Sequence, residues 1–254
     1  MPCRRHDHDR GKAKAVTYAT ARRLLPAPLR RYVYSFETMI EDAVTRLAGS
    51  LSEGARVLDA GAGEGQYAHH FPRQRYTGVD LGVGDTDWNY AGLDAVADLG
   101  ALPFPDATFD AALNIVTLEH LREPGRALRE MARVLKPGGV LLLIAPHEWV
   151  VHQAPHDYFR YTCHGLRFLL EQAGLEVQSL TPAGGYFRLM SRRLLGGLQF
   201  FPGPLKLVAA LLLAPPALLL PLLDGLDTAK NFTLGYCSLA SKTSRRDGES
   251  SGSR

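Results

Sequence analysis

Residues 56–67, R-V-L-D-A-G-A-G-E-G-Q-Y, constrain the fold more than any other part of this 254-residue chain. A short apolar run ends on Asp59, and Gly61, Gly63 and Gly65 follow within five positions, before a helix-compatible segment. Glycine is needed where a backbone turns sharply and a ligand must approach it closely. A strand that breaks into glycines and resumes as a helix is typical of the first turn of a nucleotide-binding α/β unit.

The glycine spacing separates two kinds of nucleotide site. A dinucleotide fingerprint reads G-x-G-x-x-G, whereas this turn reads G-x-G-x-G, and the third dinucleotide glycine would fall on Gln66. The acidic side chain of Asp59 would repel a pyrophosphate but would suit an ammonium group. A nicotinamide-dependent oxidoreductase therefore stays the disfavoured alternative.

Val57 to Gly65 resembles motif I of the class I S-adenosylmethionine (SAM) dependent methyltransferases. Further blocks of that family follow in order, over roughly residues 50 to 180. They are Gly78–Asp80, Val96–Leu99, Leu102–Asp110, Val116–His120 and Val134–Leu142. Leu102–Asp110 and Val116–His120 are typical of the small-molecule, type-11-like branch. The resemblance implies an enzyme that uses SAM as its methyl donor.

Alternating strands and helices predict a doubly wound α/β fold with a mostly parallel sheet. The resemblance implies a seven-stranded Rossmann-like methyltransferase sheet of order 3-2-1-4-5-7-6, with strand 7 antiparallel. The ligand then lies at the carboxyl ends of strands one, two and four. Strands are expected at 55–59, 76–80, 94–97, 109–115, 140–145, 175–181 and 234–241, and helices at 32–49, 64–71, 124–135 and 163–173. Residues 82–92 are expected to form a loop.

The resemblance also implies a set of cofactor-binding residues. In the family the second-strand acid binds the ribose hydroxyls, the acid after the third strand meets the adenine amino group, and the motif I acid holds the methionine ammonium. The positions here are Asp59, Gly61, Gly63, Gly65, Asp80, Leu81, Asp98, Leu99 and Asn114. A helix cap at Asp59 and an ordinary turn at Asp98 stay open as alternatives.

The candidate catalytic groups are three histidines in the loop after the fifth strand, His147, His152 and His156. A histidine titrating near neutral pH can act as general base for a hydroxyl acceptor. The alternative is that the aromatic residues pack this loop and that Asp157 and Arg160 pair structurally. His147 and His152 are five residues apart, not the four of H-E-x-x-H, so no metal site is predicted.

An apolar run at 205–223 is nearly long enough to span a membrane, but three prolines interrupt it. A crossing would also place the last strand on the wrong side of the membrane, so we expect no span. We expect a break at Pro215-Pro216 and two short helices that dip into a surface. A peripheral membrane contact, a homodimer interface and a lid over the substrate pocket stay open.

The chain reads as one domain at 32–242, with a leading helix and the apolar insertion at about 204–224. A basic, partly disordered arm precedes it at 1–31, with nine Lys or Arg against two acids, and a disordered tail follows at 243–254. Three scattered cysteines and the lack of a signal-like apolar segment indicate a cytoplasmic protein, with contact to the inner face of a membrane left open.

These observations predict a methyltransferase for a small acceptor, either apolar or lipid-linked, with transfer to oxygen, carbon or nitrogen all open. Asn114 is not followed by the Pro-Pro-aromatic signature of DNA amino-group methylation, and no aromatic-basic interleaving is present. Nucleic acid is therefore disfavoured as a partner. A non-catalytic, SAM-binding partner protein at a membrane is the remaining alternative.

Overall fold

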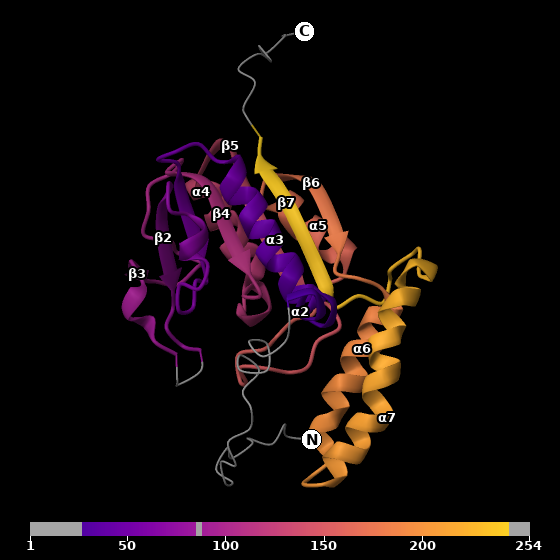
Figure 1. The fold of residues 1–254 in the computed structure, drawn as a ribbon. Helices are drawn as coiled ribbons and strands as arrows, with labels where there is room; N and C mark the ends of the chain where they lie inside the picture. The colour runs from indigo at the N-terminus through magenta and orange to yellow at the C-terminus, as the bar shows by residue number, and fades with distance from the viewer. Residues whose placement is uncertain (1–26, 85–87, 244–254) are drawn as a thin grey trace.

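The computed structural model describes residues 27–84 and 88–243. Most of the predicted basic arm and nearly all of the predicted tail lie outside these residues. The described chain forms a central sheet covered by helices, with a pair of long helices projecting from one end (Figure 1).

A single seven-stranded sheet of order β3-β2-β1-β4-β5-β7-β6 forms the centre of the protein. Its strands are β1 Arg56–Ala60, β2 Arg75–Asp80, β3 Ala95–Val96, β4 Phe109–Ile115, β5 Leu135–Pro146, β6 Leu175–Pro182 and β7 Gly235–Lys242. β7 runs antiparallel to both β5 and β6, and the other neighbours are parallel. The predicted fold class, strand order and antiparallel seventh strand are confirmed.

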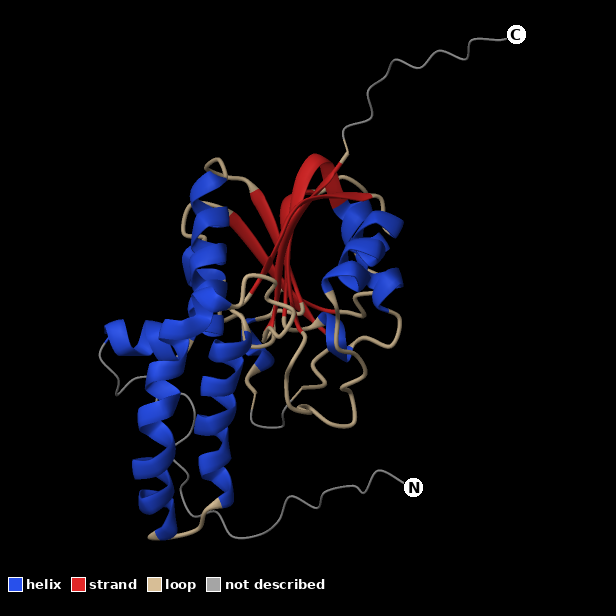
Figure 2. Ribbon diagram, turned by 90° about the vertical axis from the view of Figure 1, so that its right-hand side faces the viewer, coloured by secondary structure: helices blue, strands red, loops and turns tan. Residues whose placement is uncertain are grey.

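Helices cover both faces of the sheet, which Figure 2 shows edge-on. On one face the helix α3, Ser35–Ser50, buries Phe36, Ile40, Val44 and Leu47. The apolar residues recur three or four positions apart, as expected for a helix with one face on a core. On the other face lie α4, Pro124–Val134, and α5, Cys163–Gln172. The two apolar clusters thus flank the central strands, which are buried on both sides.

The predicted helix over 64–71 is wrong, because the structure has turns there and only a 3₁₀ helix, η1, at Ala68–His70. Gly65 adopts a positive φ of 75°, which an α-helix does not allow. Few residues then remain before Pro72. The bonds that form are of the short 3₁₀ type, such as those from Ala68 N to Gly65 O and from Phe71 N to Ala68 O. The glycine turn is therefore followed by hydrogen-bonded turns and a short 3₁₀ helix rather than by an α-helix.

The predicted stop after the helix at Pro124 is confirmed, but β5 begins at Leu135, earlier than predicted. Lys136-Pro-Gly-Gly139 forms an irregular start to this strand, since the pairing jumps from Phe109–Leu135 to Ala111–Val140. An ion pair stabilises this irregular start of the strand, because Lys136 Nζ lies 2.7 Å from an Asp110 carboxylate oxygen. The remaining short elements are α2 Ala27–Val33, η2 Tyr90–Gly92, η3 Leu118–His120, η4 Leu198–Phe200 and η5 Leu220–Leu226.

The expected break at Pro215-Pro216 is also wrong. The helix α7, Leu205–Leu219, continues through both prolines and passes directly into η5. Proline removes an N–H donor and crowds the preceding turn, but here packing along the neighbouring helix α6, Tyr186–Gly197, holds the helix together. The Ser191 hydroxyl donates to the carbonyl of Ala217, whose side chain is fully buried. The hairpin is thus built from α6 and α7 (Figure 1).

Two aspartates anchor the start of this hairpin. Asp224 accepts from Gly185 N and Arg188 N, each at 3.1 Å, and Asp227 accepts from Tyr186 N at 2.8 Å. Negative side chains satisfy the free N–H groups at a helix start and suit its positive dipole end. The first turn of α6 is therefore fixed to the segment that returns from η5.

Candidate functional site

A cavity of about 1150 Å³ opens at the carboxyl ends of β1, β2 and β4. Its walls come from α3, from the turns after β1, β2 and β3, and from the loops after β4 and β5. The parallel strands end at the same edge of the sheet, as the pairings of β1 with β2 and with β4 show. This is the position predicted for the ligand site.

The turn after β1 is tied to β2. Gly61 N and Ala62 N both donate to Val79 O, at 2.8 and 3.0 Å. Gly61 has a φ of 92°, and a side chain there would collide with Thr117, which follows β4. Gly63 has a φ of 55°, and a Cβ atom there would come within 3.0 Å of the Trp88 ring. Glycine is therefore required at both positions by conformation and by space.

Asp80 at the end of β2 joins this turn to the next one. One carboxylate oxygen accepts from Gly63 N at 3.0 Å, and the other accepts from Gly82 N at 2.8 Å. Each oxygen keeps a second lone pair, and Asp80 lines the cavity. The carboxylate can therefore bind a ligand hydroxyl without giving up its backbone bonds.

Other predicted cofactor residues also line the cavity, namely Gly61, Gly63, Leu81, Asp98 and Leu99. Asp98 accepts from Gly100 N at 2.8 Å, so its predicted alternative role as a turn acid is met at the same time. Leu99 is buried and presents an apolar wall next to this carboxylate. The structure thus brings an acid, an apolar wall and the second acid, Asp80, around one end of the cavity.

Three of the predicted cofactor residues lie elsewhere. Gly65 is in the turn but not among the residues that line the cavity. Asn114 is fully buried and its side-chain N–H donates to Ala60 O at 2.7 Å, which braces β4 against β1. Asp59 is also buried, and its side chain accepts a 2.6 Å hydrogen bond from the Tyr76 hydroxyl.

Burial and the nearby negative charge of Asp80 raise the pKa of Asp59 to about 7, although the Tyr76 hydroxyl opposes the shift. A carboxyl group taken out of water holds its proton more tightly unless a positive charge compensates. Asp59 therefore changes charge near neutral pH, close behind the glycine turn.

A cluster of three side chains, Glu119, His120 and His152, lies on the loops after β4 and β5, whereas the predicted ribose and adenine residues are at the ends of β2 and β3, beyond β1 in the sheet. Glu119 is fully buried in η3, and the two histidines line the cavity. The two Nε2 atoms are 3.1 Å apart, and Glu119 Oε1 lies 3.6 Å from His120 Nε2 and 3.5 Å from His152 Nε2. The sequence analysis pointed to His152 but not to its partnership with Glu119.

The loop that carries His152 is braced by an ion pair. The two terminal guanidinium nitrogens of Arg160 donate to Asp157, at 2.6 and 2.7 Å, and Arg160 also donates to Val150 O. Asp157 in turn accepts from His152 N at 2.9 Å, and its side chain is only 2 % exposed. The structural pairing of Asp157 with Arg160, left open in the sequence, therefore positions His152.

The pKa of His152 is raised above its usual value. Burial opposes the charged form, but the nearby carboxylates of Glu119 and Asp157 and the Val150 carbonyl favour it more strongly. The Glu119 carboxylate is close enough to attract a charged imidazole, yet it is not aligned to accept a hydrogen bond from it.

The other two candidate histidines differ from each other. His156 lines the cavity, with Nδ1 3.1 Å from the Tyr158 hydroxyl. His147 is not among the cavity-lining residues; its Nδ1 bonds Tyr161 O at 3.0 Å and its ring lies beside Tyr236. The structure thus brings His152 and His156 to the site, and not His147.

Several cavity residues escaped the sequence analysis. Trp88 covers Gly63, Thr117 faces Gly61, and Glu37 and Trp149 form the wall beside α3 and β5. Arg192 of α6 links the last two, since its guanidinium lies 2.6 Å from Glu37 and over the Trp149 ring. Nothing in the local sequence signals these contacts, because the partners are far apart in the chain.

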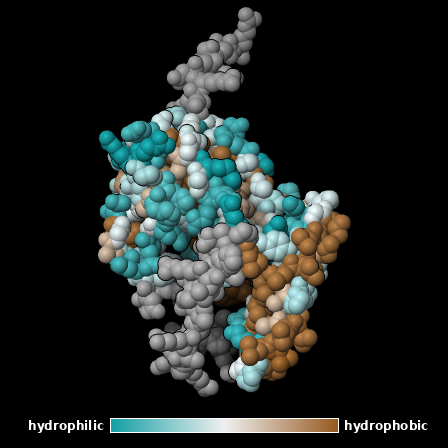
Figure 3. Space-filling view, viewed as in Figure 1, coloured by the Kyte–Doolittle hydropathy of each residue, from teal (hydrophilic) through white to brown (hydrophobic). Residues whose placement is uncertain are grey.

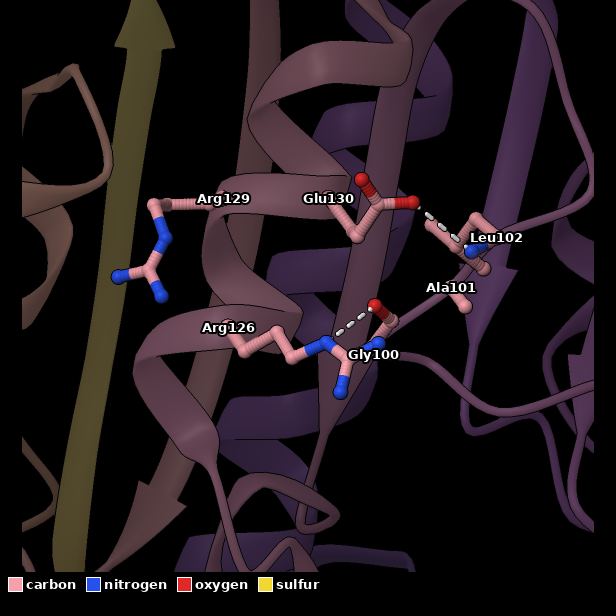
Figure 4. A pocket seen from close by; sticks show the side chains of 6 residues that line it. All are labelled: Gly100, Ala101, Leu102, Arg126, Arg129 and Glu130. Atoms are coloured by element: carbon pink, nitrogen blue, oxygen red, sulfur yellow. Dashed lines mark hydrogen bonds between the residues drawn. The ribbon is translucent and has the colours of Figure 1, made fainter.

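A second, smaller hollow of about 430 Å³ adjoins the cavity between α4 and the turn after β3 (Figure 4). Arg126 there donates to Gly100 O at 2.9 Å, and Glu130 accepts from Leu102 N at 2.9 Å. These bonds fix the turn that carries Asp98 and Leu99. The hollow therefore supports the wall of the main cavity.

Comparison with known proteins agrees with this geometry. Residues 58–143 match the family model described as a methyltransferase domain. A fatty-acid O-methyltransferase of Mycolicibacterium smegmatis is 41 % identical over 100 residues, which are 35 % of this chain and 36 % of that protein. A ubiquinone/menaquinone biosynthesis C-methyltransferase of Pectobacterium atrosepticum is 32 % identical over 146 residues, which are 52 % and 56 %. The chain spans about a third to a half of the length of these relatives.

A solved structure shares the fold. The Haemonchus contortus phosphoethanolamine N-methyltransferase 2, in complex with phosphomonomethylethanolamine and S-adenosylhomocysteine, gives a TM-score of 0.52 at 17 % identity. The match covers 79 % of this chain and 51 % of that one.

We predict that Asp59→Asn removes a pH-dependent loss of stability. The folded pKa of about 7 lies above the usual value of 3.8, so the folded state binds this proton more tightly than the unfolded state. The stabilisation is complete below about pH 4 and is lost as the pH rises to about 7, a change on the order of 4 kcal/mol.

Urea unfolding at pH 5 and pH 8 measures this effect as the difference between wild type and Asp59→Asn. The variant should gain stability relative to wild type at pH 8. The exposed acid Glu53 provides the control: the stability of Glu53→Gln should change between pH 5 and pH 8 by nearly as much as that of wild type. An equal pH response in wild type and Asp59→Asn would contradict the raised pKa.

Proposed function

We propose that this member of the class I SAM-dependent methyltransferase family transfers a methyl group from SAM to a small acceptor that is apolar or lipid-linked. The observation that carries the proposal is the glycine turn, where a side chain at Gly61 would fill the space beside Thr117, with Asp80 at its edge. Such a cradle fits a ligand that approaches the backbone closely.

In the proposed arrangement the ribose hydroxyls bind Asp80, and the adenine lies between Leu81 and Leu99 with its amino group toward Asp98. The methionine part then follows Gly61 and Gly63 toward Thr117. Asp59 acts on the ammonium through its charge rather than by direct contact, because its side chain faces Tyr76. The apolar walls and the two acids of the cavity support this placement.

When bound, SAM supplies an electrophilic methyl group on its sulfonium sulfur. The protein has to hold the acceptor in line with that group and keep water away. The cluster of Glu119, His120 and His152 lies where the acceptor's reacting atom would be, and it takes the proton that leaves an oxygen or nitrogen acceptor. The nearby carboxylate of Glu119 favours the charged form of His152 and raises the pKa of that histidine, against the opposing effect of burial.

The acceptor class follows from the surface next to the cavity. Arg192 joins α6 to Glu37 and Trp149, so the hairpin of α6 and α7 begins beside the cavity wall. In the described part of the chain, no residue of α6 or α7 lines the cavity, which leaves the lid interpretation without support. An apolar acceptor could reach the cavity from a surface on which this hairpin rests.

We infer that this surface is a lipid bilayer. Leu205–Leu226 has a mean hydropathy of 2.1 over its most apolar window, and only 22 % of that window is buried. By length and composition it could cross a membrane, yet its packing against α6 and the return to β7 favour lying on the surface. Figure 3 shows a continuous apolar surface along the hairpin, beside a mostly hydrophilic sheet domain.

The composition of α7 favours lipid over a second protein chain. From 205 to 223 the chain contains one charged residue, Lys206, and no acid. Interfaces between proteins usually carry a polar rim with hydrogen bonds, which this face does not offer. The described exposed residues include Leu207, Leu211, Leu219 and Leu222. Cytoplasmic, peripheral attachment through this face is the localisation that we propose.

Asp80→Ala should weaken SAM binding by about 1–3 kcal/mol, roughly 5- to 150-fold, because the ribose hydroxyls lose their acceptor. Isothermal titration calorimetry with SAM and S-adenosylhomocysteine measures it. Asp94→Ala is the matched control, since Asp94 also accepts a backbone hydrogen bond, from Gly78 N, but lies outside the cavity. Tight NAD binding with no heat from SAM would overturn the proposed function.

His152→Ala should lower methyl-transfer turnover by about 10²–10⁴-fold while leaving the dissociation constant of SAM unchanged. The reason is that His152 lies on the loop after β5, whereas the predicted ribose and adenine residues are at the ends of β2 and β3. Single-turnover assays with an apolar alcohol acceptor, which keeps its proton at neutral pH, measure the rate. His147→Ala serves as control and should retain turnover, and equal rates in both variants would exclude the cluster from catalysis.

Replacing Leu207, Leu211, Leu219 and Leu222 together by Ser should abolish binding to anionic vesicles, because each of these side chains is more than 60 % exposed. Flotation in a density gradient measures binding. The control replaces Val96 and Phe168, which are equally exposed but lie on the sheet domain. Wild-type protein that stays at the bottom of the gradient as a monomer would exclude membrane attachment. Wild-type protein that stays at the bottom and forms a concentration-dependent dimer would support a homodimer interface on this face instead.

A further inference from the structure

We propose that Glu119, His120 and His152 bind a divalent transition-metal ion such as Zn²⁺, with a fourth position open to the cavity. The sequence predicted no metal site, because the spacing of His147 and His152 is not that of H-E-x-x-H, and nothing in it joined Glu119 and His120 to His152. Tertiary structure brings them together: η3 follows β4, the His152 loop follows β5, and these strands pair in parallel up to Ile115 and Ile144.

The hydrogen bonds of the two imidazoles decide which nitrogens are free. His120 Nδ1 lies 2.7 Å from His156 O, and His152 Nδ1 lies 3.1 Å from Val150 O. A carbonyl oxygen can only accept, so each Nδ1 carries the hydrogen. Both Nε2 atoms of the neutral rings then carry lone pairs, and these lone pairs face each other across 3.1 Å.

The carboxylate of Glu119 is a third hydrogen-bond acceptor beside the two Nε2 atoms. Among the residues that the structure describes, neither oxygen of Glu119 has a hydrogen-bond partner, although the side chain is fully buried. A buried, unpaired carboxylate is strongly unfavourable without a compensating cation. A single shared proton could join only two of the three acceptors, whereas a metal ion would satisfy all three.

The distances match a tetrahedral ion. Zinc lies about 2.0–2.2 Å from His nitrogen and carboxylate oxygen, so neighbouring ligand atoms are about 3.3–3.5 Å apart. The three separations here are 3.1, 3.5 and 3.6 Å. Two imidazoles and one carboxylate, with one position left open, form the ligand set of many catalytic zinc sites.

Outer partners also fit a metal site. Metal-binding histidines commonly donate their other N–H to a carbonyl or a carboxylate, which fixes the ring. Both rings do so here, and Asp157 Oδ2 lies 3.5 Å from His152 Nδ1, itself held by Arg160. His120 and His152 line the cavity while Glu119 lies behind them, so the open position faces the acceptor. On the proposed function, that position would take an acceptor oxygen and make its proton easier to lose, and with the ion bound this effect would replace direct proton transfer to a histidine, because both Nε2 lone pairs would be occupied.

A second group, Glu41, His69 and His70, lacks these features. His70 Nε2 already contacts a Glu41 carboxylate oxygen at 2.9 Å, and His69 Nδ1 lies 2.9 Å from Gln66 O. His69 is exposed, and no buried carboxylate there lacks a partner in the described residues. This group therefore serves as a control.

Titration of the metal-free, full-length protein with Co²⁺ tests the site, because tetrahedral Co²⁺ absorbs strongly in the visible range. We expect one tight ion per chain, displaced by Zn²⁺. Glu119→Gln and His152→Ala should each weaken binding by at least the roughly 10–100-fold that loss of an outer partner costs. Zn²⁺ should raise the melting temperature of wild type but not of these variants.

Matched controls are His147→Ala, His69→Ala and the double replacement of His6 and His8 by Ala, which should all keep the absorption. Near-ultraviolet circular dichroism checks the fold of each variant. Wild type without tight Co²⁺ binding, or well-folded Glu119→Gln and His152→Ala variants with unchanged affinity, would overturn the proposal. The titration needs neither SAM nor an acceptor, so its failure would leave the proposed methyl transfer standing.

Discussion

The site depends on the hydrogen bonds that tie the turn after β1 to the end of β2. Val79 O accepts from two successive N–H groups, and the Asp80 carboxylate accepts from a third, at Gly63. These bonds use backbone donors, so they hold only if the turn adopts its left-handed glycine conformations. The same carboxylate also orders the next turn through Gly82, which makes it the junction of two cavity walls.

The buried acids Asp59 and Asp157 differ in pKa because their hydrogen-bond and ion-pair partners differ. Among the described residues Asp59 has a hydroxyl partner and no cation, and burial raises its pKa to about 7. Asp157 has Arg160 as a partner, which holds its pKa below the usual range despite the opposing effect of burial. One carboxyl group thus remains responsive to pH while the other permanently braces a loop.

Glu119 is a third buried acid with a different environment: its carboxylate lies near two histidines but forms no hydrogen bond with either of them. It lies where the carboxyl ends of β4 and β5 meet, and Arg192 of the α6–α7 hairpin contacts Trp149, which also follows β5. The expected SAM site, the expected site of the methyl acceptor and the apolar surface of the hairpin therefore follow one another across the molecule. A lipid-linked acceptor could approach along this direction without crossing the hydrophilic face of the sheet domain.

The sequence by itself determined the α/β class and the glycine turn, which depend on local patterns: apolar periodicity, glycines at fixed spacing, and acids at strand ends. The seven-stranded order and the expected cofactor residues followed from the resemblance of these motifs to the methyltransferase family. Asp80 ends β2, and Asp98 and Leu99 come shortly after β3, so the resemblance placed all three at the edge where the carboxyl ends of the strands meet, and all three line the cavity. The leading helix could likewise be predicted from the spacing of its apolar residues.

Only the tertiary structure decided which polar groups share a point in space. Glu119 and His152 are 33 positions apart in the chain, and parallel pairing of β4 with β5 brings them within 3.5 Å. Asn114 was placed in the site by sequence, but its side chain points between two strands and bonds Ala60. The helix through Pro215 and Pro216 persists because α6 packs along it, and local proline rules carry no information about such a neighbour.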